Sequence, residues 1–324
     1  MKGKEARIVF MGTPEFAVAS LDALVSSGYK VAGVVTAPDR PAGRGQKLTG
    51  SAVSDYAVSK GLKTLKPEKL KDPVFLGELK SLEADLQVVV AFRMLPEVVW
   101  HMPPLGTFNL HASLLPQYRG AAPLNWVLIN GERETGVTTF LLDQQIDTGR
   151  IIFREPMAIG DEETAGELHD RLMESGAKLI LKTVDALAEG TIEPVDQSHV
   201  LQFDAALRHA PKIFRENCRI SWAEKAEPIR NLIRGLSPYP AAWTTLVNRK
   251  SKLSNILKIY FATKEVESHS HEPGFIVSDN RSFLKIACAD GWICVANLQA
   301  EGRKRMKTEE FLRGFPPVQE FTAT

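Results

Sequence analysis

The sequence predicts an α/β protein in which a mostly parallel sheet, covered by helices, is followed by a smaller β-barrel. Three observations support this fold class. The chain has 324 residues, which is long for one domain and comfortable for two. In the first half, short apolar runs alternate with segments of helical spacing, as in a sheet with helical crossovers. After Pro211 the pattern changes to several short strands separated by turns.

The elements of the first half follow in chain order. The apolar run Arg7–Met11 predicts a strand. Thr13 is expected to cap the helix that follows, with Pro14 at its first position, and Gly28 is expected to end it. Later strands are predicted at Val31–Thr36, Leu86–Ala91, Phe108–His111 and Thr138–Leu142. Helices are predicted at Ala52–Lys60 and from the capping-box pattern Thr164-Ala165-Gly166-Glu167 to about Ala188.

The second half is separated from the first by a polar, irregular stretch. We therefore expect a domain over residues 1–189, a linker over 190–207 and a second domain over 208–324. In this second domain a helix is predicted at Ile229–Arg234. Strands are predicted at Ala242–Val247, Leu257–Ala262, Gly274–Ser278, Phe283–Ala287 and Trp292–Leu298.

Composition predicts a cytoplasmic globular protein with no membrane association. Hydrophobic residues make up 44% and charged residues 24%, and no apolar run approaches the length of a membrane span. The apolar run after Arg7 is too short for a signal peptide. The three cysteines, Cys218, Cys288 and Cys294, lack metal-ligand spacing and suggest a reducing compartment. No ligand cluster for a metal is visible, so no metal is expected.

Charge is divided unequally along the chain. Residues 1–207 hold 21 Lys and Arg against 27 Asp and Glu, whereas residues 208–324 hold 19 against 12. A basic half joined to an acidic half suggests that the second domain meets a polyanion such as a nucleic acid. A merely solubilising surface is the alternative.

Three polar residues follow predicted strands and form a candidate catalytic group. Asn109 and His111 are two residues apart, so on a strand they point to the same side. Asp147 follows the next strand, and ligands of such sheets bind at the carboxyl ends of strands. An amide, an imidazole and a carboxylate can polarise a carbonyl and transfer one proton. A histidine at a strand end can also be a purely structural residue.

Several motifs resemble one enzyme family. Asn109, His111, the run Ser113-Leu114-Leu115-Pro116 and Asp147-Thr148-Gly149 resemble the 10-formyltetrahydrofolate-dependent formyltransferase superfamily. Met11–Phe16 and Pro38–Gly45 are similar to the branch of that superfamily that acts on methionyl-tRNA. The resemblance continues through Arg234–Pro240 and so covers nearly the whole chain.

The resemblance implies a fold, an activity and partners. The fold is a Rossmann-like formyltransferase domain followed by an OB-like barrel that binds tRNA. The activity is transfer of the formyl group of 10-formyltetrahydrofolate to the α-amino group of methionyl initiator tRNA, which supplies translation initiation. The partners are the methionylated initiator tRNA and the folate, and the protein is expected to be a monomer.

The chemistry assigns a role to each candidate catalytic residue. The amine attacks the formyl carbon as a neutral nucleophile, and negative charge develops on the formyl oxygen. Asn109 would donate an amide N–H to that oxygen, and protonated His111 would stabilise the same charge. Asp147 would hold His111 protonated and is a candidate to collect the proton of the amine.

The resemblance also implies the folate contacts. Ser113, Leu114, Leu115 and Pro116 would contact the folate, partly through backbone groups. Phe92-Arg93-Met94-Leu95-Pro96 resembles the segment that borders the pterin pocket, but it is shorter and less apolar than the common form.

Two basic segments are the candidate tRNA contacts. Arg40, Arg44 and Lys47 lie in the Pro- and Gly-rich stretch Pro38–Leu48, which corresponds to the loop that enters the acceptor-stem region in the family. The densest basic cluster holds Arg303, Lys304, Arg305 and Lys307, which we expect to contact phosphates. Solvated surface loops are the alternative for both segments.

Two other functions remain open from the sequence. One is formylation of a small amine such as a sugar nucleotide, and the basic second domain argues against it. The other is an RNA-binding protein without catalytic activity, and the joint presence of Asn109, His111 and Asp147 argues against that.

Overall fold

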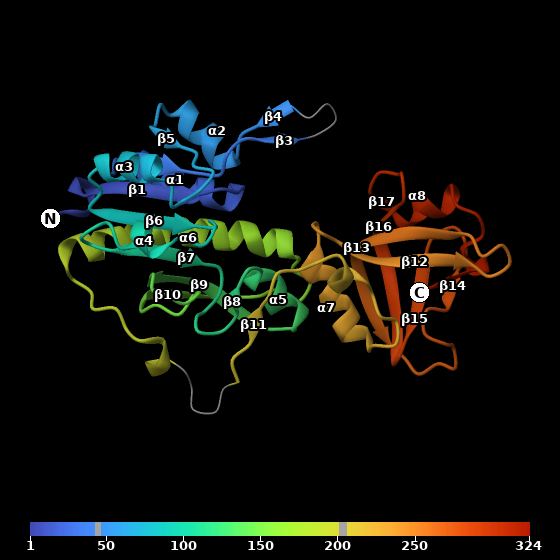
Figure 1. Ribbon diagram of the computed structural model, residues 1–324. Coiled ribbons are helices and arrows are strands. Elements are labelled where there is room, and N and C mark those ends of the chain that lie inside the picture. The colour runs from blue at the N-terminus through green and yellow to red at the C-terminus, as the bar shows by residue number, and fades with distance from the viewer. Residues whose placement is uncertain (43–46, 201–205) are drawn as a thin grey trace. The chain divides into compact units, whose positions relative to one another are not determined.

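The computed structural model describes residues 1–42, 47–200 and 206–324 of the chain (Figure 1). The chain forms two compact units, each assembled from three separate stretches. Unit 1 comprises Met1–Pro123, Glu134–Ala158 and His169–His209. Unit 2 comprises Leu124–Arg133, Ile159–Leu168 and Ala210–Thr324.

Unit 1 is built on a seven-stranded sheet with the strand order β10-β9-β7-β6-β1-β2-β5. Neighbouring strands from β7 to β5 are parallel, whereas β9 and β10 are antiparallel. The predicted mostly parallel sheet is therefore confirmed. Its strands are β1 (Arg7–Gly12), β2 (Lys30–Val35), β5 (Thr64–Leu65), β6 (Leu86–Val90), β7 (Thr107–His111), β9 (Glu134–Leu141) and β10 (Ile151–Ala158).

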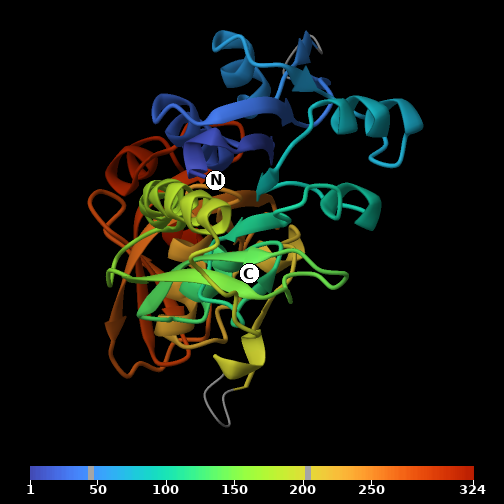
Figure 2. The same cartoon turned by 90° about the vertical axis from the view of Figure 1, so that its left-hand side faces the viewer.

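Helices cover both faces of this sheet. Figure 2 shows α1 and α6 on one side and α3 and α4 on the other. Alternate strand residues such as Val9, Met11 and Val89 are buried in one cluster with residues of α3 and α4, as a sheet buried on both faces requires. The helices are α1 (Glu15–Ser26), α2 (Ala52–Ser59), α3 (Pro73–Ser81), α4 (Glu97–Trp100) and α6 (Ala165–Glu189), whose first turn belongs to unit 2.

Two of the predicted helix ends are confirmed and one is wrong. Pro14, with ψ of 175°, is itself the N-cap of α1, so the prediction that Thr13 caps this helix is wrong. Gly28 ends α1 with φ of 79°, a conformation that glycine adopts without strain. The capping box of α6 is present: the Thr164 N–H donates to Glu167 at 2.8 Å, and hydrogen bonds from the Thr164 backbone and side chain lower the pKa of Glu167.

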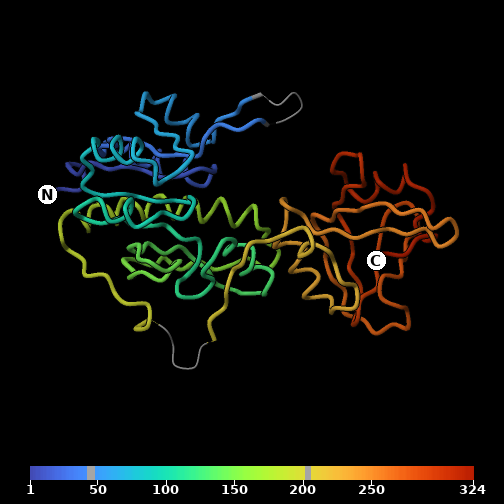
Figure 3. The backbone as a smooth tube through the Cα atoms, in the orientation of Figure 1, coloured from blue at the N-terminus to red at the C-terminus, as the bar shows by residue number. Residues whose placement is uncertain are grey.

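A two-stranded hairpin extends away from the sheet of unit 1, as Figure 3 shows. Its strands are β3 (Arg40–Ala42) and β4 (Lys47–Thr49), which pair in antiparallel fashion. The sequence predicts this stretch only as a loop. Of the basic residues of this stretch, Arg40 and the backbone of Lys47 therefore lie on strands.

Unit 2 is an antiparallel barrel with the strand order β14-β15-β16-β13-β12-β18, and β17 pairs with β16. A bridge between Phe275 and Thr322, and the hydrogen bond from Ala323 N–H to the Gly274 carbonyl at 2.9 Å, link β18 back to the start of β14. The predicted small barrel is confirmed, and it is nearly closed. Its strands are β12 (Ala242–Asn248), β13 (Ser254–Val266), β14 (Ile276–Ser278), β15 (Leu284–Cys288), β16 (Gly291–Ala300), β17 (Met306–Lys307) and β18 (Phe321–Ala323).

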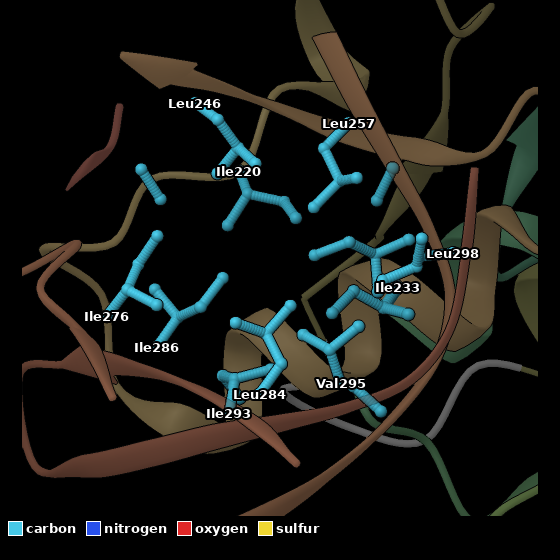
Figure 4. Packing of buried hydrophobic residues seen from close by; sticks show 14 of the residues in the cluster. Ile220, Ile233, Leu246, Leu257, Ile276, Leu284, Ile286, Ile293, Val295 and Leu298 are labelled. Carbon is cyan, nitrogen blue, oxygen red and sulfur yellow. The ribbon is translucent and has the colours of Figure 1, made fainter. Parts of the chain in front are cut away.

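The barrel interior is filled by branched aliphatic side chains. Figure 4 shows Leu246, Leu257, Ile286 and Leu298 converging with Ile233 of α7 (Ala226–Leu236). Helix α7 is thus the amphipathic cover of this core, and α8 (Thr308–Arg313) adds Phe311 and Leu312.

Two stretches from earlier in the chain complete unit 2. Helix α5 (Pro123–Ile129) supplies Asn125, whose side-chain amide donates to the Gly235 carbonyl at 2.8 Å. The buried Arg234 guanidinium donates to the Gly160 carbonyl at 3.2 Å. These contacts join α7 to segments that lie about 70 to 110 residues away in sequence.

Candidate active site

His111 is the last residue of β7 and is almost fully buried. Its ring Nε2 lies 2.9 Å from the Tyr118 carbonyl oxygen. Because a carbonyl only accepts hydrogen bonds, Nε2 must carry a proton. The other ring nitrogen, Nδ1, lies 3.9 Å from Oδ2 of Asp147.

Asp147 reaches His111 by a route that differs from the expected one. Because β9 is antiparallel to β7, its last residue Leu141 lies opposite Phe108, away from His111. Asp147 follows the carboxyl end of a strand as expected, but because β9 is antiparallel that end does not lie beside the carboxyl end of β7. The loop 142–150 instead folds back to bring the carboxylate to the imidazole.

The Asp147 carboxylate is fixed by a backbone donor. Its Oδ2 accepts a hydrogen bond from the Gly120 N–H at 2.9 Å. Asp147 itself has φ of 56°, in the left-handed region that a non-glycine residue rarely occupies. The loop therefore holds one strained residue whose side chain has a defined partner and lies beside the His111 ring.

Asn109 lies two residues before His111 on β7 and is half-buried. The alternation of a strand places both side chains on the same face. In the described part of the chain the Asn109 side-chain amide has no hydrogen-bond partner, so its N–H groups are available to a substrate. The structure thus brings an available amide donor, an imidazole and a carboxylate to one face of the sheet.

The segment Ser113–Pro116 is a turn whose polar groups form hydrogen bonds within the protein. The Ser113 hydroxyl donates to the Gln117 carbonyl at 2.7 Å, and the Leu115 N–H donates to the Thr138 hydroxyl at 3.1 Å. Leu115 and Pro116 are buried, whereas Leu114 is partly exposed. Contact of these four residues with folate stays a prediction.

The segment Phe92–Pro96 is held by Arg93. The Arg93 guanidinium donates to the Glu68 carbonyl at 2.9 Å and to the Pro67 carbonyl. Partial burial lowers the pKa of this guanidinium. Met94 follows with 69% of its surface exposed, so this departure from the family pattern leaves a large apolar side chain in solvent.

The structure describes most, but not all, of the residues predicted to contact tRNA. Arg40 is exposed on β3, whereas Arg44 and the side chain of Lys47 lie outside the described part of the chain. The cluster around β17 is exposed at each of its four predicted positions, Arg303, Lys304, Arg305 and Lys307. Their role in binding stays a prediction.

The structure shows contacts between arginine and aromatic side chains in unit 2 that the sequence analysis missed. The Arg305 guanidinium lies 4.5 Å from the Tyr260 ring, and its Nε donates to Asn297 at 2.7 Å. On β12, Trp243 is approached by the guanidinium groups of Arg215 and Arg219 at 5.4 and 5.7 Å. The alternation of buried and half-exposed positions along β12 turns Trp243 outward. The sequence of this strand gave no signal of that, because its buried positions include Thr244 and its outward ones include Val247.

The sequence analysis also missed the backbone partners of the site. The Tyr118 carbonyl and the Gly120 N–H hold His111 and Asp147, and backbone groups leave no residue-type signal. Residues 190–207, expected as a linker, contain Val195, which pairs with Ile151, and Gln197, which is buried beside the Asp147 loop.

Among residues 1–42, 47–200 and 206–324, no group of three or more His, Cys, Asp or Glu side chains is placed to hold a metal ion. Within those same ranges, every helix is too short or too polar to cross a membrane.

Comparison with known proteins gives consistent matches over both units. Residues 6–184 match the family described as formyl transferase, and residues 212–316 match the formyl transferase C-terminal domain. The chain is 54% identical over 323 residues to a methionyl-tRNA formyltransferase of Parabacteroides distasonis, covering 99% of both chains. It is 51% identical over 311 residues to one of Flavobacterium johnsoniae, covering 96% of both chains.

Solved structures share the fold at lower identity. An N-formyltransferase from Helicobacter canadensis, in complex with folinic acid and dTDP-3-aminofucose, has a TM-score of 0.65 at 21% identity, covering 90% of this chain and 98% of that one. HypX from Aquifex aeolicus, in complex with tetrahydrofolic acid, has a TM-score of 0.63 at 17% identity. That match covers 95% of this chain and 47% of HypX.

Proposed function

Because this chain belongs to the formyl transferase family, we propose that it transfers the formyl group of 10-formyltetrahydrofolate to the α-amino group of methionyl initiator tRNA. The observation that carries this proposal is the available Asn109 amide on the same strand face as the paired His111 and Asp147. Identity above 50% to relatives named methionyl-tRNA formyltransferase supports the choice of acceptor.

The site residues supply the groups that acyl transfer to an amine needs. The bond between the amine nitrogen and the formyl carbon forms, and the bond between that carbon and the donor nitrogen breaks. Negative charge develops on the formyl oxygen, to which Asn109 donates an N–H. A proton on Nδ1 of His111 would add positive charge there, and the Asp147 carboxylate at 3.9 Å would stabilise that proton.

Proton transfer completes the reaction. The attacking nitrogen becomes positively charged and loses a proton to Asp147, directly or through one water molecule. Asp147 then returns this proton, directly or through one water molecule, to the donor nitrogen as the bond to the formyl carbon breaks and tetrahydrofolate leaves. The Gly120 N–H bond fixes one carboxylate oxygen of Asp147 and leaves the other to accept the proton.

The folate donor is supported by fold neighbours and by exposed apolar side chains. Two neighbours are described in complex with tetrahydrofolic or folinic acid. In unit 1, Met94 and Ile146 are exposed at 69% and 62% in the loops that follow β6 and β9. A flat heteroaromatic ring is a suitable partner for such side chains.

The tRNA acceptor is supported by the charge and chemistry of unit 2. Exposed Arg and Lys side chains of the β17 cluster can neutralise phosphates, and outward aromatic residues such as Trp243 can stack on bases. A formyltransferase for a small amine has no need of such a surface.

The direct test is a formylation assay with purified protein. Incubation with 10-formyltetrahydrofolate and methionyl initiator tRNA is expected to give N-formylmethionyl-tRNA. Methionyl elongator tRNA and an amino-sugar nucleotide serve as competing acceptors. Formylation of the sugar nucleotide with none on methionyl-tRNA would contradict the proposal.

Neutralising the β17 cluster should weaken tRNA binding. We expect replacement of Arg303, Lys304, Arg305 and Lys307 by alanine to lower affinity for tRNA, because counterion release falls with each lost phosphate contact. The slope of log affinity against log salt should decrease by up to ~0.9 per lost contact on a duplex. Salt-titrated binding measures this, and folate affinity should not change.

A matched control separates a local effect from net charge. Alanine at four exposed lysines of unit 1, Lys60, Lys69, Lys71 and Lys80, removes the same charge elsewhere. If both four-fold variants show the same salt slope as the unaltered protein, the cluster is only a solvated surface.

A further inference from the structure

Gln197 is a buried side chain with every polar group in use. Its amide nitrogen donates to the carbonyl oxygens of Asp147 and Gly149, each at 2.9 Å. Its amide oxygen accepts from Nε and Nη2 of Arg119 at 3.1 and 2.6 Å. A glutamine amide has two donors and two acceptor lone pairs, so its hydrogen-bonding capacity is complete. Only 3% of its surface is exposed.

The turn that Gln197 contacts is tight. Asp147 has a positive φ, and a Cβ at Gly149 would lie 1.7 Å from the Leu141 carbonyl oxygen. Such a backbone persists only where the surroundings fix it. The two carbonyl groups held by Gln197 are one source of that constraint, because without the amide a buried and a partly buried acceptor would each have one partner fewer.

The other end of Gln197 reaches the segment that holds the imidazole. Arg119 lies between Tyr118, whose carbonyl binds His111, and Gly120, whose N–H binds the Asp147 carboxylate. Gln197 therefore connects the two backbone segments that set the positions of His111 and Asp147.

From this geometry we propose that Gln197 is a positioning residue for the transfer reaction. It fixes the Asp147 carboxylate against His111 by joining the Asp147–Gly149 turn to Arg119. The proposal rests on the proposed function, in which Asp147 and His111 act as a pair. It gives a role to a residue that lies 50 positions away from Asp147 and outside the family motifs quoted above.

The substitution Gln197→Glu keeps the contact of this side chain with Arg119 and removes its hydrogen bonds to the two carbonyl groups. Glutamate has nearly the same shape and still accepts from Arg119, as a carboxylate that favours a guanidinium. It has no N–H to offer and places negative charge against the two carbonyl oxygens. We expect kcat for formyl transfer to fall at least tenfold, with KM for tRNA and folate changed less than twofold. Replacing the exposed His199, two residues away, by glutamine should leave both constants unchanged.

A double-substitution cycle distinguishes positioning from general structural damage. If Gln197 acts through Asp147, then Gln197→Glu should have little further effect on kcat in an Asp147→Asn background. Equal losses in both backgrounds would overturn the proposal. A fall in melting temperature with no change in kcat would overturn it as well.

A crystal structure needs no turnover, so it tests the positioning role of Gln197 independently of the proposed function. In crystals of the Gln197→Glu variant we expect the Asp147 carboxylate to have left the Gly120 N–H. If the carboxylate keeps that bond and its distance to His111, the proposal fails even where formylation is confirmed. If methionyl-tRNA is not formylated but the carboxylate moves, the proposed function fails and the positioning role stands.

Discussion

Replacing His111 with alanine is expected to lower kcat for formyl transfer by a factor of roughly 10² to 10³, the usual loss for one donor to a developing oxyanion. The imidazole is almost fully buried, and its Nε2 is held by the Tyr118 carbonyl, so its position in the site is fixed. Single-turnover formylation with saturating substrates measures the chemical step directly.

The same experiment on Asn109 separates the two donors. Asn109→Ala removes an amide whose N–H groups have no partner in the described structure, so little stability should be lost with it. We expect a similar fall in rate, and tRNA binding should be unchanged in both variants because the proposed role of both residues is at the formyl oxygen. A variant that keeps its full single-turnover rate would remove that residue from the mechanism.

The second large effect is expected for Asp147→Asn, which should lower kcat by about 10³ or more, as loss of the carboxylate beside a catalytic imidazole does elsewhere. The asparagine oxygen can still accept from the Gly120 N–H, so the turn should keep its shape. What is lost is the negative charge 3.9 Å from Nδ1 of His111 and the acceptor for the amine proton. The measurement is kcat as a function of pH.

A neighbouring substitution controls for damage to the loop. Gln144 lies in the same loop and is exposed, so Gln144→Ala should leave the rate and its pH dependence unchanged. If Asp147→Asn keeps both a high rate and an unaltered pH profile, Asp147 is only a turn residue.

The sequence predicted the elements whose apolar pattern is strong. Burial on at least one face gives a strand a recognisable pattern of apolar residues. This holds for the sheet strands β1, β6 and β7 and for the barrel strands β12, β13 and β16. The edge strand β10 was missed because its second half, Arg154 to Ala158, is largely exposed. Short α4 and the β3–β4 hairpin offer too few residues for a periodicity to appear.

The candidate site was predicted in its residues but not in its connections. Asn109, His111 and Asp147 were chosen by residue type and family resemblance, and the structure confirms that His111 and Asp147 lie together. The sequence could not show that the loop 142–150 returns to His111, because that depends on the antiparallel direction of β9. It also could not show the role of Gln197, because a glutamine far along the chain has no local signal of burial.

Unit 2 is built from three separate stretches of the chain, so its parts are synthesised at different times. Helix α5 and residues 159–168 emerge well before α7, with which Asn125 and Gly160 form hydrogen bonds. Domains generally fold as units and from the N-terminus first during synthesis. Helix α5 and residues 159–168 therefore have no α7 to pack against until residue 236 has left the ribosomal exit tunnel. Unit 2 therefore completes its packing only late in translation, and a nascent chain stalled before α7 exposes surfaces that the finished protein buries.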